Sequence, residues 1–169
     1  MKPAELLKLY QEDSRIIELS ECLGVYVNGQ VHLKNTFGSL RSLIVSAVSS
    51  SIDGCHLLIL PDNEAAAYAY SDLQNLMGDK SLLFFPASYR SNLNKEKPDK
   101  SNVLKRTDCL GKIGNIQDFE GKTCIVVTYP EALDEQVVSK PEFDEAIISL
   151  DKGNIVSQEE IIFSTQRGH

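Results

Sequence analysis

Residues 35–42 are the first candidates for chemistry, because they lie between an expected strand and an expected helix, the setting of a phosphate-binding loop. The pattern G-x-x-x-x-G-K-[ST] falls on Asn35, Leu40, Arg41 and Ser42, with Gly38 and Ser39 between them, and only Ser42 matches. Glycines in such a loop let backbone N–H groups approach phosphates, whereas the Leu40 side chain obstructs them. Arg41 keeps the charge of lysine but not its slim ammonium group. We therefore expect a degenerate loop that begins a helix and binds no nucleotide, with weak anion binding as the alternative.

A nucleotide-hydrolysing site of this type also needs an acidic pair after a buried strand to hold Mg²⁺. The expected strands end at Leu60, Phe85 and Tyr129, and a proline follows each of them. An Asp-Glu pair occurs at residues 144 and 145, but no buried strand precedes it. We expect a solvated turn there, and we assign no ATP and no Mg²⁺ to this chain.

The second candidate is the basic segment at residues 90–106, where six Lys and Arg residues stand against two acidic ones, a local charge of +4 in a chain of −7. Contact with a nucleic acid backbone would involve Arg90, Lys95, Lys97 and Lys100, with Tyr89 as a nearby stacking group. The favoured interpretation is a solvated, mobile loop that contains Pro98. Nucleic acid contact is the alternative.

Nucleophilic and metal chemistry is not expected from these residues. Ser88, Ser91 or Cys109 would need a histidine partner, but no G-x-S-x-G motif occurs and both His32 and His56 fall within expected strands. The four cysteines show no C-x-x-C spacing, and we interpret them as reduced thiols that act as small hydrophobic side chains. They are Cys22, Cys55, Cys109 and Cys124. No catalytic residue and no metal ligand is assigned.

Alternating strands and helices are predicted to position these residues. Apolar spacing predicts one or two helices over 4–22 and further helices over 40–48, 63–77 and about 103–113. A strand with a turn at Asn28-Gly29 is predicted over 25–34, and continuous apolar runs predict strands at 55–60, 81–85 and 123–129. Asp62 is expected to cap the helix that follows it and Gly78 to end that helix, while Glu64 and Asp72 belong to a solvated helix face.

The continuous apolar runs are typical of strands that are covered on both faces, so we predict an α/β fold, a parallel sheet with helices on both faces. The pattern changes after Pro141, where residues 143–150 are predicted to form another strand. A capping box at residues 157–160 then predicts the start of a helix. Because the chain stops a few residues into that helix, we expect a fragment of a longer protein.

Composition excludes several classes of protein. The chain has 169 residues, of which 42% are hydrophobic and 24% charged, the balance of a soluble globular protein. A net charge of −7 argues against a surface built as a whole to attract nucleic acid. No apolar run approaches the roughly 20 residues needed to span a bilayer, and no signal peptide is recognisable at the start. We therefore expect a cytoplasmic protein with no membrane partner.

Four segments in a fixed order carry a resemblance to a known family. They are residues 33–43 (LKNTFGSLRSL), 58–66 (LILPDNEAA), 83–86 (LFFP) and 125–133 (IVVTYPEAL). Their order and spacing resemble the amino terminus of the bacterial transcription-repair coupling factors, over roughly residues 25–163. In that family the first domain is similar to UvrB, the helicase-like subunit of nucleotide excision repair, and has lost its ATP site.

The resemblance implies three segments: a helical segment at 1–24, a UvrB-like α/β domain with a degenerate phosphate-binding loop at 25–150, and at 151–169 the truncated start of a UvrA-recruiting domain. The parent protein would be an ATP-dependent DNA translocase that displaces stalled RNA polymerase and recruits excision repair, with ATP and Mg²⁺ in its motor domains. Its implied partners are those motor domains, UvrA, RNA polymerase and duplex DNA. This chain would be a non-catalytic scaffold and regulatory module.

A stand-alone domain is the alternative interpretation. A doubly wound domain that binds a nucleotide or another small ligand would have its site at the carboxyl ends of the strands, near Pro61, Pro86 and Pro130.

Overall fold

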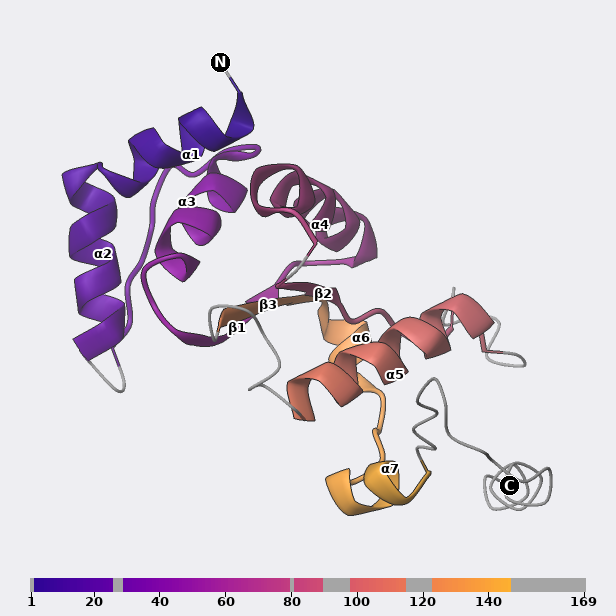
Figure 1. The fold of residues 1–169 in the computed structure, drawn as a ribbon. Helices are drawn as coiled ribbons and strands as arrows, with labels where there is room; N and C mark the ends of the chain where they lie inside the picture. The colour runs from indigo at the N-terminus through magenta and orange to yellow at the C-terminus, as the bar shows by residue number, and fades with distance from the viewer. Residues whose placement is uncertain (1, 26–28, 80, 90–97, 115–122, 147–169) are drawn as a thin grey trace, which may run out of the picture. The chain divides into compact units, whose positions relative to one another are not determined.

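The computed structural model describes residues 2–25, 29–79, 81–89, 98–114 and 123–146. The chain divides into two compact units, Met1–Glu135 and Gln136–His169. The first unit contains three parallel strands with helices on both faces of the sheet, which confirms the predicted α/β class (Figure 1). No helix in the described part of the chain is long and apolar enough to cross a membrane.

The sheet has the strand order β1-β3-β2, so the last strand in sequence lies in the centre. Strand β3 (Thr123–Thr128) pairs in parallel with β1 (Gly54–Ile59) on one side and with β2 (Leu82–Phe84) on the other. Residues Cys124 to Thr128 are all buried, as expected for a central strand that is covered on both faces. The apolar run therefore correctly predicted that this segment forms a buried strand.

Strand β1 differs from the prediction, because its continuous apolar run is not covered on both faces. Its residues alternate between half-buried and exposed, and Leu57 and Ile59 are 55% and 51% exposed. The physical reason is that β1 is an edge strand, and that among the described residues α5 packs against β2, on the other side of the central strand.

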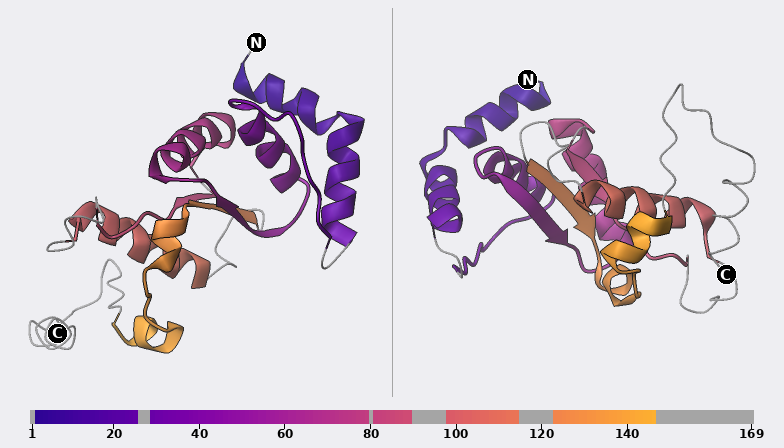
Figure 2. Two further views of the ribbon diagram at one scale, coloured as in Figure 1. Left: turned by 180° about the vertical axis from the view of Figure 1, so that it is seen from behind. Right: turned by 60° about the horizontal axis from the view of Figure 1, so that its bottom comes forward.

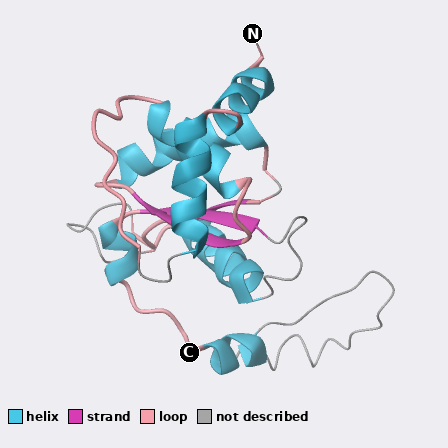
Figure 3. Ribbon diagram, turned by 90° about the vertical axis from the view of Figure 1, so that its left-hand side faces the viewer, coloured by secondary structure: helices cyan, strands magenta, loops and turns pink. Residues whose placement is uncertain are grey.

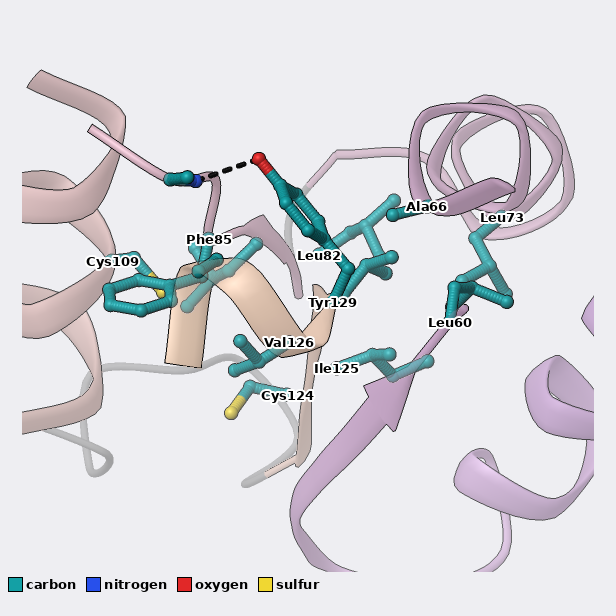
Figure 4. Close-up of a cluster of buried hydrophobic side chains, with 14 residues drawn as sticks. Leu60, Ala66, Leu73, Leu82, Phe85, Cys109, Cys124, Ile125, Val126 and Tyr129 are labelled. Carbon is teal, nitrogen blue, oxygen red and sulfur yellow. Dashed lines mark hydrogen bonds between the residues drawn. The ribbon is translucent and has the colours of Figure 1, made fainter. Parts of the chain in front are cut away.

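Three helices cover the two faces of the sheet. Helices α3 (Leu40–Ser49) and α4 (Asn63–Met77) lie on one face, and α5 (Lys100–Gly114) lies on the opposite face (Figures 1 and 3). Asp62 caps α4 as predicted, since its Oδ1 accepts a hydrogen bond of 2.8 Å from the backbone N–H of Ala65. Gly78, with a φ of 80°, ends the same helix. The core between these layers contains Ala66, Leu73, Ile125, Val127 and Cys109 (Figure 4).

Two N-terminal helices form an outer layer beyond α3, on the side away from the sheet (Figure 2). They are α1 (Pro3–Gln11) and α2 (Ser14–Val25), which agrees with the prediction of one or two short helices. A second apolar cluster joins them to α3: Ile16 and Leu19 of α2 pack with Ala47 and Val48 of α3. The first turn of α1 lies close to the start of α3, since Pro3 and Ser39 line the same pocket.

Residues 29–34 form no strand, contrary to the prediction for 25–34, whose residues 26–28 lie outside the described part. Val25 is instead the last residue of α2. Val31 and Leu33 line an apolar pocket together with side chains of α2, α3 and β1. Their alternation therefore accompanies a position beside this pocket rather than pairing along a strand, and the candidate loop at 35–42 is not directly preceded by a strand.

The second unit contains one described helix, α7 (Lys140–Ala146), where the sequence predicted the beginning of a strand. The side chain of Glu142 accepts hydrogen bonds from the backbone N–H and the hydroxyl of Ser139, which caps the start of the helix. Pro141 in the first turn favours a helix over a strand. The remaining predicted strand residues, the boundary at 150/151 and the capping box at 157–160 lie outside the described residues.

A short helix completes the first unit. Helix α6 (Pro130–Asp134) begins directly after β3 and has Pro130 in its first turn, where the missing N–H is not needed. Its Ala132 is fully buried. Helix α6 therefore follows the central strand directly, and its Ala132 belongs to the core of the unit.

Candidate functional site

The candidate phosphate loop turns sharply before α3. Asn35 and Gly38 both have positive φ, 59° and 54°. The N–H of Leu40 donates to the carbonyl oxygen of Phe37 at 3.2 Å, which closes a tight turn before the helix. Ser39 occupies the N-cap position but its side chain makes no capping hydrogen bond. The segment thus begins a helix, as the sequence indicated, through a short turn rather than a wide glycine-rich loop.

The one residue that matches the phosphate-loop pattern, Ser42, points into the protein. It is 4% exposed, and its hydroxyl lies 3.4 Å from Oδ2 of Asp72 on α4. Arg41, at the position of the phosphate-binding lysine, is exposed to solvent. Asp72 itself is half-buried, and a buried hydroxyl paired with its carboxylate is not placed to hold a magnesium ion together with a nucleotide phosphate.

The start of α3 borders a pocket that side chains of α1 and α4 help to form. Its volume is about 250 Å³, and Pro3, Leu6, Leu76 and the carboxylate of Asp72 are among its lining residues. A helix N-terminus attracts anions, but a carboxylate at the same position repels them. Lys2 also lines this pocket, so its two charged groups are of opposite sign. The geometry therefore gives no specific support to the weak anion binding that the sequence left open.

The carboxyl ends of β2 and β3 are joined by Arg106 of α5. Its Nη1 donates hydrogen bonds of 2.9 Å to the carbonyl oxygens of Pro86 and Ala132, and it lies 3.4 Å from Oε2 of Glu135. The guanidinium also lies 4.1 Å from the ring centre of Phe85. Burial lowers the pKa of Arg106, and the nearby Glu135 carboxylate opposes that shift.

The backbone after β2 is held by further side chains of the same unit. The hydroxyl oxygen of Tyr129 accepts a hydrogen bond of 2.8 Å from the N–H of Ala87 (Figure 4), and the Asn102 amide donates to the Ala87 carbonyl oxygen at 2.9 Å. Both carboxylate oxygens of Glu135 lie 2.9 Å from the N–H of Ser88. Burial raises the pKa of Tyr129, so its hydroxyl stays protonated at neutral pH. The polar groups at these strand ends are thus paired with one another.

Sequence reasoning missed this role of Arg106, which it counted in the basic segment at 90–106. The side chain is 6% exposed and faces the protein interior. A signal was present in the sequence, because Arg106 lies three residues before Cys109 on the apolar stripe of α5 that also contains Ile113. A charged residue on the apolar side of an amphipathic helix indicates an internal ion pair.

The candidate nucleic acid contacts fall mainly outside the described residues. Arg90, Lys95 and Lys97 all lie outside the described residues. Lys100 is the first residue of α5 and is exposed, and Tyr89 is half-buried. The structure therefore places one of the four predicted contact residues on the surface and does not test the others.

The nucleophile candidates are not brought together in the described part of the chain. His56 lies 2.9 Å from the carbonyl oxygen of Ile52 through Nε2, and His32 is exposed. Cys109 is 1% exposed, and burial raises the pKa of its thiol to about 12. Among the described residues, no three His, Cys, Asp or Glu side chains gather in a way that would hold a metal ion. Ser91 lies outside the described part.

Comparison of the chain with protein-family models, with curated proteins and with solved structures finds no match. The choice of function therefore depends on this chain's own residues and their geometry.

Proposed function

We propose that this chain is a non-catalytic module at the amino terminus of a transcription-repair coupling factor, with a UvrB-like α/β domain whose nucleotide site is degenerate. In the parent protein it acts as a scaffold and regulatory element of an ATP-dependent DNA translocase that displaces stalled RNA polymerase and recruits nucleotide excision repair. The observation that carries this proposal is the pairing of Ser42 with Asp72 at the start of α3.

This pairing opposes nucleotide binding for an electrostatic reason. Bound ATP would bring several negative charges to the N-terminus of α3, where the Asp72 carboxylate already lies within 3.4 Å of the only matching hydroxyl. At an effective dielectric constant of about 20, two like charges 4 Å apart repel by about 4 kcal/mol. Arg41 occupies the position of the phosphate-binding lysine, and its side chain is exposed to solvent.

The carboxyl end of the sheet supports the same conclusion. In doubly wound proteins small ligands bind at this edge. Here Arg106, Glu135 and Tyr129 satisfy the backbone groups that a ligand would otherwise contact. We therefore propose that the domain binds no nucleotide at the start of α3 or at the carboxyl end of the sheet, and that it acts through protein and DNA contacts on its surface. Its partners in the parent protein would be the motor domains, UvrA, RNA polymerase and duplex DNA.

The first test is the gene sequence that follows His169, together with nucleotide binding by the chain itself. We expect the gene to encode a UvrB-like second domain and then a motor with an intact G-x-x-x-x-G-K-[ST] motif and a later D-E-x-[HQ]. We also expect no saturable binding in calorimetric titrations with millimolar ATP and Mg²⁺. A stop codon at or close to His169, or saturable ATP binding, would overturn the proposal.

A second function is favoured by one pocket. A stand-alone ligand-binding domain could use the space of about 330 Å³ beside the edge strand β2, between α4 and α5. Its lining includes the rings of Tyr70 and Phe84, whose centres are 5.3 Å apart and whose planes are tilted by 57°. The ammonium group of Lys105 lies 5.8 Å from the centre of the Phe84 ring. Saturable binding of a small ligand that is lost on Lys105→Met would favour this function.

A further inference from the structure

Two cysteines from distant parts of the chain lie directly opposite each other on neighbouring strands. Cys55 of β1 and Cys124 of β3 are register partners in the parallel ladder. The Cys124 thiol donates to the sulfur of Cys55, and the two Sγ atoms are 3.0 Å apart. Both cysteines are free thiols. The fold therefore brings together two thiols that are 69 residues apart in sequence and do not form a C-x-x-C motif.

The backbone at this pair has the spacing that a disulfide requires. Neighbouring strands lie about 4.7–4.9 Å apart, and disulfides form between Cα atoms about 4.4–6.8 Å apart. The two side chains already point toward each other, because their sulfur atoms are in contact. Closing a bond between them therefore requires rotation of the side chains and no separation of β1 from β3.

The two thiols differ sharply in their access to solvent. Cys55 is exposed on the edge strand, whereas Cys124 is fully buried in the central strand. Burial and the contact with Cys55 raise the pKa of Cys124 to about 12. Of the other two cysteines, Cys109 is buried on α5 in the same core cluster as Cys124, and Cys22 is half-buried on α2. A reagent in solution consequently reaches Cys55 before Cys124.

We propose that Cys55 and Cys124 form a thiol-modification site that reacts with small-molecule disulfides of the glutathione type and becomes a cross-strand disulfide. In the first step the Cys55 thiolate attacks one sulfur of the small disulfide. A mixed disulfide forms at Cys55, and one small thiol leaves with the proton that Cys55 gave up. In the second step the sulfur of Cys124 attacks that of Cys55. The cross-strand bond forms, the mixed disulfide breaks, and a second small thiol leaves with the proton of Cys124.

The electrons balance over the two steps. The protein loses two electrons and two protons as its two thiols become one disulfide, and the small disulfide gains both to become two thiols. The reaction is reversible by excess small thiol. Its product ties the edge strand to the central strand across 69 residues of sequence. The exposed apolar side chains of Leu57 and Ile59 belong to β1, the strand that the disulfide joins covalently to β3.

The test treats the reduced chain with oxidised glutathione and maps its disulfides by mass spectrometry of tryptic peptides. We expect the wild type to yield a linked peptide pair that contains Cys55 and Cys124, with no glutathione retained at either. Cys124→Val should stop at the first step and carry one glutathione on Cys55. Cys55→Ser should take up no glutathione at Cys124, and Cys22→Ser should behave as the wild type does.

Circular dichroism before treatment checks that each variant is folded. The linked peptide pair is also quantified in the wild type, so the proposal can be tested even if a variant does not fold. The proposal is overturned if the wild type retains glutathione on Cys55 without forming the cross-link. Linkage of Cys124 to Cys109, or the absence of any reaction at Cys55, would overturn it equally.

Discussion

Nη1 of Arg106 lies 3.4 Å from Oε2 of Glu135, and the same nitrogen donates hydrogen bonds to the carbonyl oxygens of Pro86 and Ala132. One side chain of α5 thereby connects the segment after β2 with the helix after β3. The Arg106 side chain is 7% exposed and that of Glu135 is 24% exposed, so the pair is screened by solvent only in part. This arrangement closes the edge of the sheet at which a doubly wound domain would bind its ligand.

Removal of Arg106 should destabilise the first unit strongly. In Arg106→Met the Glu135 carboxylate loses its cationic partner, and two carbonyl oxygens lose their shared donor. Breaking a buried pair costs about 3–5 kcal/mol, and we expect a loss near the lower limit because Glu135 is partly exposed. The free energy of unfolding from urea titration measures this loss.

The matched control for this variant is the exposed ion pair on the same helix. Lys112 lies 2.8 Å from Asp108, with both side chains more than half exposed. Lys112→Met should change the free energy of unfolding by less than about 0.5 kcal/mol. Equal losses in the two variants would show that Arg106 does not hold the strand ends together.

The N-cap of α4 should contribute less to the free energy of unfolding than Arg106 does. Asp62→Ala removes the 2.8 Å hydrogen bond to the N–H of Ala65 and should lower the free energy of unfolding by about 1 kcal/mol. Asp53→Ala, at an exposed aspartate outside the helices, provides the control for loss of one negative charge. Thermal unfolding of both variants at the same pH compares them, and an equal shift in Tm would contradict the capping role.

The features that the sequence predicts correctly share a physical cause, which is that their signals are local. Asp62 and Gly78 mark the ends of α4 through hydrogen bonds and dihedral angles within a few residues. The apolar run of β3 likewise predicts a buried strand. Such features do not depend on where the rest of the chain lies.

The failures depend on contacts between distant segments. The run in β1 looks like that in β3, but only the strand order makes β1 an edge strand with Leu57 exposed. Val31 and Leu33 alternate like a strand, yet they line a pocket together with side chains of α2, α3 and β1. The Cys55–Cys124 contact follows from the register of β1 on β3, which no local pattern specifies. At the candidate phosphate loop, the missing lysine was visible in the sequence but the Asp72 partner was not.

Buried thiols should make the protein less stable at alkaline pH. Burial raises the pKa of Cys109 to about 12 from an ordinary value of 9.0, so the folded state favours the neutral thiol. Its contribution to stability is complete below pH 9. It is lost as the pH rises from 9 toward 12, because the unfolded chain then releases the proton more readily. Cys109→Ala should therefore lose less stability over this range than the wild type does.

Urea titrations at pH 7, 9 and 10.5 measure this effect as the change in the free energy of unfolding with pH. Cys22→Ala is the control, because Cys22 is only half-buried on α2. We expect the control to follow the pH profile of the wild type. A Cys109→Ala profile as steep as that of the wild type would contradict the prediction.

Charge reversal tests the alternative role of the basic segment at residues 90–106, which is contact with nucleic acid. If Lys95, Lys97 and Lys100 contact phosphates, their joint replacement by Glu weakens binding to duplex DNA and reduces the slope of log K against log salt by about 0.9 for each contact removed. The same charge change at Lys2, Lys8 and Lys34, which are exposed at the N-terminal end of the chain, is the control. Fluorescence anisotropy with a labelled duplex at several salt concentrations measures both. Equal weakening by the two sets would indicate that net charge, and not this segment, determines the binding, and unchanged binding in the first set would remove the segment as a contact.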